Sequence, residues 1–258
     1  MSLYSKAQLL MSLLRYIALG LLISCGSGSA RVAQPSETGN TKTATLSNWF
    51  AGGLTGKKLC FVGDSTTSNA TVLFNQLGTY TLRGGSLYGI APILNFGENG
   101  ASLQAFLSNI VVHGVTSTIA AQADLYVISY GINDVRLGNT PEDQLVSLLI
   151  DAVDRIRVGV PNADIVLRVP NSLLTTDVNG YGFVQPNSNA QAYSGILRNA
   201  YLRLRNRWSN VVIFDSQELV FGTVSLPSSP LMFDQLHPSS TGYTALANAL
   251  ITVIGYSN

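Results

Sequence analysis

The sequence predicts an α/β protein built around a single parallel β-sheet. Five short runs of apolar, β-branched or aromatic residues occur along the chain, as expected for strands that are buried on both faces. Segments with the period of an amphipathic helix lie between these runs. Strands that alternate with helices in this way form parallel sheets covered by helices on both faces. The 258 residues contain no internal repeat and suffice for one domain with a full hydrophobic core.

The expected elements follow from these patterns in chain order. Strands are predicted at 58–62, 92–96, 125–129, 165–169 and 211–214. A helix is predicted to begin at Pro141, because proline followed by acidic residues is a helix start signal. Two further helices are predicted at 190–208 and 239–254. In sheets of this kind, functional side chains lie in the loops that follow the carboxyl ends of the strands.

Composition and charge exclude several classes of function. Only 11% of the residues are charged and the formal net charge is +1, without a basic stripe, so a nucleic-acid partner is not expected. Two histidines and two cysteines are too few for a zinc ribbon, a zinc finger or a histidine-rich metal cage. The sequence therefore predicts no metal and no other cofactor. No apolar run is long enough for a membrane-spanning helix.

The first 46 residues are predicted to form an export signal followed by a flexible linker. Residues 1–25 begin with basic residues, contain no acidic one and include a short apolar stretch, which is typical of a secretory signal peptide. The segment around Cys25 resembles the lipobox of bacterial lipoproteins, which implies cleavage before Cys25 and its lipidation. An ordinary signal peptide and a buried helix with a chance cysteine are the alternatives. Residues 26–46 read as a flexible linker and 47–258 as the folded domain.

This organisation predicts export to the bacterial cell envelope, with the domain either tethered to a membrane by its lipid or secreted. Cys60, which lies in an apolar run, is expected to be an inert buried thiol, so no disulfide is predicted.

Two short motifs carry candidate catalytic residues. Ser65 follows the first predicted strand through a Gly-Asp turn, and a serine hydroxyl becomes a nucleophile only with a base nearby. His237 is the better candidate base, because Asp234 three residues earlier can orient its ring. His113 has no neighbouring carboxylate and is interpreted as structural. Each motif alone is common, since Asp64 or Ser65 could simply cap a helix.

Four blocks taken together resemble the signatures of the GDSL, or SGNH, hydrolase family. They appear in the family's order and are Gly63-Asp64-Ser65-Thr66, Asn95-Phe96-Gly97-Glu98-Asn99-Gly100, Gly131-Ile132-Asn133-Asp134 and Asp234-Gln235-Leu236-His237-Pro238. Thr66 stands where the family usually has Leu, a position where variation puts the resemblance little in doubt. The resemblance extends from about residue 58 to the C-terminus. It implies a flavodoxin-like three-layer α/β/α sandwich with a central five-stranded parallel sheet, and ester hydrolysis by a Ser-His-Asp triad.

The resemblance gives each site residue an expected role. Ser65 would attack the acyl carbon, His237 would transfer the proton, and Asp234 would orient His237. The Ser65 and Gly100 N–H groups and the Asn133 amide would stabilise the oxyanion. Asn133 could instead be a turn residue, because Gly-x-Asn-Asp also suits a turn. Asp64 and Asp134 are expected to brace loops rather than react.

Two long loops are expected to overhang this site, 171–190 and 218–233. The polar residues of the first loop include Asn171, Thr175, Thr176, Asn179, Tyr181, Asn187 and Asn189. Their hydroxyl and amide groups favour a small ester or an acylated glycan, such as an acetylated sugar, as the substrate. Two alternatives remain open, a non-catalytic glycan-binding module of the kind found in phage tails, and a lipoprotein with a purely structural role.

Overall fold

A parallel five-stranded sheet forms the centre of the protein. The strands are β1 (Leu59–Gly63), β2 (Ile93–Gly97), β3 (Leu125–Ser129), β4 (Asp164–Arg168) and β5 (Val211–Phe214). They lie in the order β2-β1-β3-β4-β5, and every neighbouring pair is parallel. This is the flavodoxin-like strand order. The predicted α/β class and its five-stranded parallel sheet are therefore confirmed.

The computed structural model describes residues 57–73, 75, 93–175, 189–224, 226 and 229–255. These all belong to one unit, Thr41–Asn258. The predicted signal peptide, linker and lipidated Cys25 lie outside the described residues.

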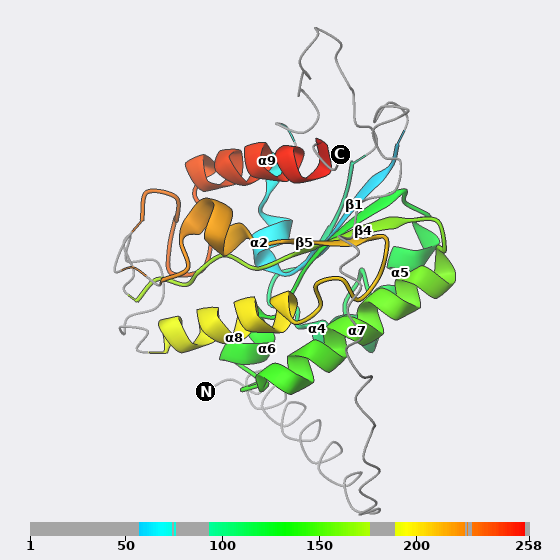
Figure 1. The fold of residues 1–258 in the computed structure, drawn as a ribbon, viewed down its shortest axis with the longest axis horizontal. Coiled ribbons are helices and arrows are strands. Elements are labelled where there is room, and N and C mark those ends of the chain that lie inside the picture. Colours follow the sequence, from blue (N-terminus) through cyan, green and yellow to red (C-terminus); the bar gives the residue numbers. More distant parts are fainter. Residues whose placement is uncertain are drawn as a thin grey trace, which may run out of the picture. The chain divides into compact units, whose positions relative to one another are not determined.

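Helices cover the sheet on both faces (Figure 1). α9 (Ser240–Gly255) lies on one face. The other face carries α4 (Leu103–Leu107), α5 (Val115–Ala120), α7 (Glu142–Gly159) and α8 (Ala190–Leu202). Two short helices, α2 (Ser65–Ser68) and α6 (Ile132–Arg136), directly follow β1 and β3, and a π-helical turn, η1 (Gln217–Phe221), follows β5. None of the helices among the described residues is long and apolar enough to cross a membrane.

Two hydrophobic cores result from the alternation of side chains along the strands. In β1, Cys60 and Val62 pack into the core shared with α4–α8, whereas Leu59 and Phe61 pack into the core shared with α9. Burial raises the pKa of Cys60 to about 12, so this thiol stays protonated at neutral pH, in agreement with an inert buried cysteine.

The boundaries of β3 and β5 agree with the prediction, and those of β1, β2 and β4 differ by one residue. One expectation was wrong, because β2 is an edge strand whose residues are only partly buried, with Asn95 exposed. The helix predicted to reach residue 208 ends at Leu202. Beyond that point the amides of Leu204 and Arg205 bond the carbonyls three residues earlier, and Asn206 has a positive φ of 61°. A left-handed residue cannot continue an α-helix, so a helix through residue 206 is excluded.

Candidate active site

Ser65 lies at the first turn after the central strand β1. Asp64 caps α2, because its Oδ1 accepts a hydrogen bond from the Thr66 amide at 2.9 Å. A Cβ at Gly63 would lie 2.1 Å from Thr67 Oγ1 and 2.5 Å from the Ser129 carbonyl oxygen, so only glycine fits at this position. The Ser65 amide belongs to the first turn of α2, where N–H groups lack an intrahelical partner. It can therefore donate to a bound ligand.

His237 and Asp234 reach Ser65 from the other end of the chain. His237 Nε2 lies 2.9 Å from Ser65 Oγ, although the two residues are 172 positions apart. His237 Nδ1 lies 2.7 Å from Asp234 Oδ2, and Asp234 Oδ1 accepts the backbone N–H groups of Leu236 and His237, each at 2.7 Å. Burial by itself would raise the pKa of Asp234, but these hydrogen bonds together outweigh it and lower the pKa. Asp234 is thus an ionised carboxylate that orients the imidazole ring.

Gly100 and Asn133 join Ser65 and His237 around one pocket of about 300 Å³. Gly100 has φ +74°, whereas an added Cβ would meet nothing within 4 Å, so its backbone conformation rather than crowding favours glycine here. The Asn133 amide nitrogen donates one hydrogen to the Ala101 carbonyl at 2.9 Å. A primary amide has two hydrogens, so the second can reach an oxyanion in the pocket.

Thr66, next to Ser65, lies at a buried junction of hydrogen bonds. Thr66 Oγ1 donates to Asp64 Oδ1 at 2.8 Å and accepts from Arg168 Nη2 at 3.2 Å. Burial raises the pKa of Asp64 and lowers that of Arg168, while the attraction between the two charges opposes both shifts. Tyr243 Oη donates to the Thr66 carbonyl at 2.9 Å. A Leu at this position could not join Asp64 to Arg168, so the Thr contributes contacts that the sequence pattern did not predict.

The first residues after β4 contact the loop that carries Asp234 and His237. Asn171 is fully buried, and its amide nitrogen donates to the Leu236 carbonyl at 2.8 Å. The Leu174 amide donates to the Gln235 carbonyl at 3.0 Å. The interpretation of Asn171 as a substrate-facing loop residue was thus wrong. Of the other residues named for this loop, Thr176, Asn179, Tyr181 and Asn187 lie outside the described residues.

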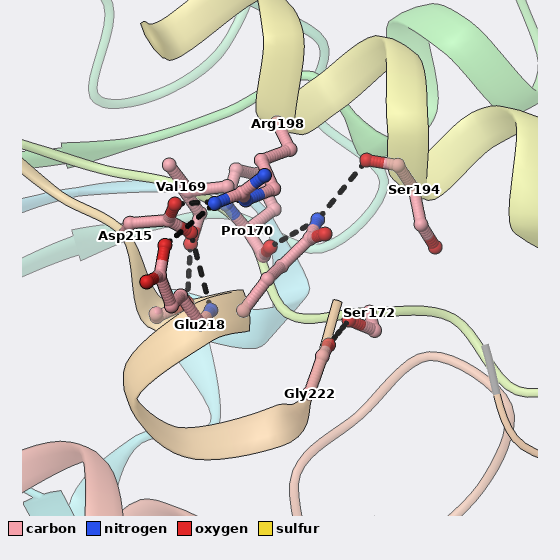
Figure 2. Close-up of polar contacts among 10 residues, drawn as sticks. Val169, Pro170, Ser172, Ser194, Arg198, Asp215, Glu218 and Gly222 are labelled. Carbon is pink, nitrogen blue, oxygen red and sulfur yellow. Dashed lines mark hydrogen bonds and ion pairs between the residues drawn. The ribbon is translucent and has the colours of Figure 1, made fainter. Parts of the chain in front are cut away.

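A polar network joins η1 to the segment after β4 and to α8 (Figure 2). Gln217 Nε2 donates to the carbonyls of Pro170 at 3.1 Å and Ser194 at 3.2 Å. Arg198 pairs with Asp215 at 2.8 Å and with Glu218 at 2.6 Å, as Figure 2 shows. The Ser172 hydroxyl donates to the Gly222 carbonyl. These contacts join the segments after β4 and β5 to each other and to α8.

The remaining candidates have structural roles. Asp134 accepts from the amides of Leu103 at 2.9 Å and Gln104 at 3.3 Å, and so braces the start of α4 as predicted. His113 stacks on Phe96, with ring centroids 4.2 Å apart. Among the described residues, no group of three or more His, Cys, Asp or Glu side chains could hold a metal ion.

Two further pockets occur in the described part of the chain. One, of about 330 Å³, shares Asn69 and His237 with the pocket at Ser65 and is also lined by the half-exposed ring of Phe233. The other, of about 450 Å³, lies between α5 and α7 and contains none of the candidate site residues. The candidate site residues line the pocket at Ser65 and the neighbouring pocket of about 330 Å³.

Comparison with known proteins extends this description. A family model described as the GDSL-like Lipase/Acylhydrolase family matches residues 61–245. No curated protein matches the chain.

Three solved structures illustrate the likeness in fold. The Clostridium thermocellum family 3 carbohydrate esterase is 18% identical, with 76% of this chain and 94% of that chain covered and a TM-score of 0.53. A carbohydrate acetylesterase family member from Sinorhizobium meliloti is 18% identical, with 77% and 99% covered and a TM-score of 0.54. A GDSL-like lipase from Bacteroides thetaiotaomicron is 15% identical, with 78% and 89% covered and a TM-score of 0.54. At these identities the likeness shows the fold alone.

Proposed function

The chain belongs to the GDSL-like lipase/acylhydrolase family, and on that premise we propose that it is a serine esterase acting through Ser65, His237 and Asp234. The observation that carries the proposal is the continuous chain of two hydrogen bonds from Ser65 Oγ through the His237 ring to Asp234. A serine hydroxyl joined to an oriented imidazole is the arrangement that nucleophilic acyl transfer requires.

The proposed reaction has two halves. Ser65 Oγ bonds to the acyl carbon as its proton passes to His237 Nε2, and the carbonyl oxygen becomes an oxyanion held by the N–H groups of Ser65 and Gly100 and the amide of Asn133. Collapse breaks the bond to the alcohol, which leaves with the proton from His237. Water then attacks the acyl-enzyme by the same route and releases the acid. Asp234 stabilises the imidazolium that forms in each half.

For the substrate, we propose O-acyl groups, such as acetyl, on a carbohydrate or another small ester. The pocket at Ser65 has a volume of about 300 Å³, which is at the small end for ligand sites and suits a short acyl group. Asn69 and Asn99 on its lining can bind hydroxyl groups of a sugar. Two of the similar solved structures are named as carbohydrate esterases.

The hydrogen bond between Ser65 and His237 favours this proposal over a non-catalytic glycan-binding module. A binding module needs polar groups and aromatic faces, but it has no use for an imidazole aligned between a serine and a carboxylate. A purely structural role likewise would not explain why Ser65, His237 and Asp234 are aligned by hydrogen bonds.

The test combines covalent labelling with substrate hydrolysis. The purified protein should react with a fluorophosphonate probe and hydrolyse acetyl esters and acetylated polysaccharides, and Ser65→Ala should abolish both. Ser68→Ala, a second serine in the same helix, is the matched control and should retain both. Hydrolysis by Ser65→Ala at the wild-type rate would exclude the proposed nucleophile.

A further inference from the structure

Arg168 carries a buried charge that the proposed reaction does not use. It is the last residue of β4 and is only 4% exposed, and its Nη1 has no hydrogen-bond partner among the described residues. Arginine stays protonated in proteins, and an isolated charge in a protein interior is costly. A cation in this position therefore requires a negative charge nearby.

Asp64, next to the proposed nucleophile, supplies that negative charge. Burial lowers the pKa of the Arg168 guanidinium, and the attraction of Asp64 is the largest influence in the opposite direction. The link between the two groups is Thr66 Oγ1, which donates to Asp64 Oδ1 at 2.8 Å and accepts from Arg168 Nη2 at 3.2 Å. Because Arg168 stays protonated, this buried pair is neutral only if Asp64 is ionised.

Three buried tyrosines lie within electrostatic reach of Asp64, namely Tyr130, Tyr201 and Tyr243. Burial raises the pKa of each phenol, so none of them is charged at neutral pH. His237 also acts on Asp64, but only in its protonated form. Of the groups that act on Asp64, Arg168 is thus the one with a permanent positive charge.

Arg168 reaches Thr66 across the end of β3. This strand lies between β1 and β4 in the sheet, and Ser129 is its last residue. Two residues earlier on each strand, Val127 and Val166 pack in the core shared with α9. Since side chains alternate along a strand, Ser129 and Arg168 lie on that same face of the sheet. The short side chain of Ser129 leaves room for the guanidinium to reach the turn after β1.

The position of Ser65 depends on Thr66, the residue that follows it. The Thr66 amide and hydroxyl donate to Asp64 Oδ1 at 2.9 and 2.8 Å. The same hydroxyl accepts from Arg168, and the Thr66 carbonyl accepts from Tyr243. These bonds fix the first turn of α2, and with it the directions of Ser65 Oγ and the Ser65 N–H.

We propose that Arg168 is a positioning residue for Ser65, because through the Thr66 hydroxyl it holds ionised Asp64 and the first turn of α2 in place. This inference rests on the proposed esterase function and adds to it a residue that does not line the pocket at Ser65. Without the guanidinium, Asp64 would be an unpaired buried carboxylate, which tends to take up a proton. A neutral carboxyl accepts hydrogen bonds less strongly than a carboxylate, so α2 and Ser65 would be held less firmly.

The first experiment compares Arg168→Met, which removes the charge, with Arg168→Lys, which keeps it, in the hydrolysis of p-nitrophenyl acetate. We expect Arg168→Met to lower kcat by about 10–100-fold with little change in KM, because a small displacement of a reacting group costs rate rather than binding. Arg168→Lys should recover a substantial part of kcat. Val153→Ala is the matched control, because Val153 is fully buried in α7 and outside this group of residues. It should lower stability but keep kcat per folded molecule.

A double-mutant cycle with Asp64→Asn separates an effect of charge from one of packing. If Arg168 acts through the charge of Asp64, Arg168→Met should cost much less kcat in the Asp64→Asn background than in the wild type. The same fold-loss in both backgrounds would mean that Arg168 only fills space, and would overturn the inference. Wild-type kcat in Arg168→Met would also overturn it, while leaving the esterase proposal intact.

A measurement without turnover separates this inference from the esterase proposal. In protein labelled with ¹³C at the aspartate carboxyls, the NMR signal of Asp64, identified by its absence from Asp64→Asn, reports the ionisation of that group. Burial raises the pKa of Asp64 and the charge of Arg168 lowers it, so Arg168→Met should move the titration to higher pH and Arg168→Lys should not.

An unchanged Asp64 titration in Arg168→Met would refute the inference, whether or not the protein hydrolyses esters. A shifted titration in a protein that hydrolyses no ester supports the link between Arg168 and Asp64 and counts against the esterase proposal alone.

Discussion

Asn133 combines a proposed catalytic contact with a structural one, because its amide also donates to the Ala101 carbonyl. Removal of an oxyanion donor costs on the order of 10²–10³ in kcat, with little change in KM. We therefore expect Asn133→Ala to lower kcat by about that factor and to lower the melting temperature modestly. kcat, KM and melting temperature should be measured on one preparation. An unchanged kcat beside a lower melting temperature would assign Asn133 to the turn alone.

Thr66 shows how a single hydroxyl can join two buried charges. Thr66→Val keeps the shape of the side chain but removes the atom that binds both Asp64 and Arg168. We expect a loss of about 1–3 kcal/mol in the free energy of unfolding, the cost of leaving buried polar groups unpaired. Thr66→Ser keeps the hydroxyl and should lose clearly less. Denaturant unfolding measures both, and equal losses for the two variants would show that the methyl group, not the hydroxyl, is what matters.

Asp234 makes the stability of the fold depend on pH in a defined direction. Its pKa is lowered in the folded protein, so the ionised carboxylate stabilises the fold at pH values above its unfolded pKa of about 3.9. That stabilisation is lost as the pH falls through the folded pKa. The difference in unfolding free energy between wild type and Asp234→Asn should thus be complete at pH 7 and shrink below about pH 4.

Urea unfolding of both proteins at several pH values measures this difference. Asp151→Asn is the control, because Asp151 forms an exposed ion pair with Arg155, and pairs of this kind contribute little. If the difference in unfolding free energy between wild type and Asp234→Asn stayed constant over the whole pH range, the charge of Asp234 would not be the stabilising feature.

At the scale of the elements, the contact between α2 and β2 determines where Ser65 lies. A Cβ at Gly97 would lie 2.2 Å from the Ser68 amide nitrogen, so Gly97→Ala should push α2 away from β2. We expect this variant to lose both stability and kcat. Gly195→Ala is the opposite case, because it lies inside α8 and its added Cβ meets nothing within 4 Å. It should raise stability by about 0.5–1 kcal/mol and leave kcat unchanged.

Thermal unfolding and kinetics on the two variants test this contrast. Wild-type activity in Gly97→Ala would mean that the α2–β2 contact relaxes without moving Ser65.

The elements also show what the sequence alone could predict. The boundaries of β5 are predictable because Val211–Phe214 is an uninterrupted apolar run between Asn210 and Asp215, and those of β3 because its apolar run begins after Asp124 and ends at Ser129. The edge position of β2 depends on strand order, which no local pattern records. The contact between Thr66 and Arg168 joins residues 102 positions apart, and that of Asn171 with Leu236 joins residues 65 apart, so neither leaves a local pattern. The one available signal for the first contact was an arginine, Arg168, at the end of a buried strand.

At the scale of the whole molecule, residues 1–25 are expected to act as an export signal. We propose that the precursor is exported, cleaved before Cys25 and lipidated, because the sequence there resembles a lipobox. More than one acyl chain is needed for firm anchoring to a membrane. Cys25→Ser should therefore move the protein from the membrane fraction to the soluble fraction, as measured by fractionation and immunoblotting. Mass spectrometry that finds an unmodified mature N-terminus at another residue would contradict the proposal.

The separation of 172 residues between Ser65 and His237 has a consequence for synthesis and folding of the chain. The proposed nucleophile is complete early in synthesis, but its base becomes available only when nearly the whole domain has been made and its last strand and final loop have docked. A nascent, truncated or still unfolded chain would then not hydrolyse esters. Hydrolysis would begin only after folding is complete, so enzymatic activity would report complete folding of the domain.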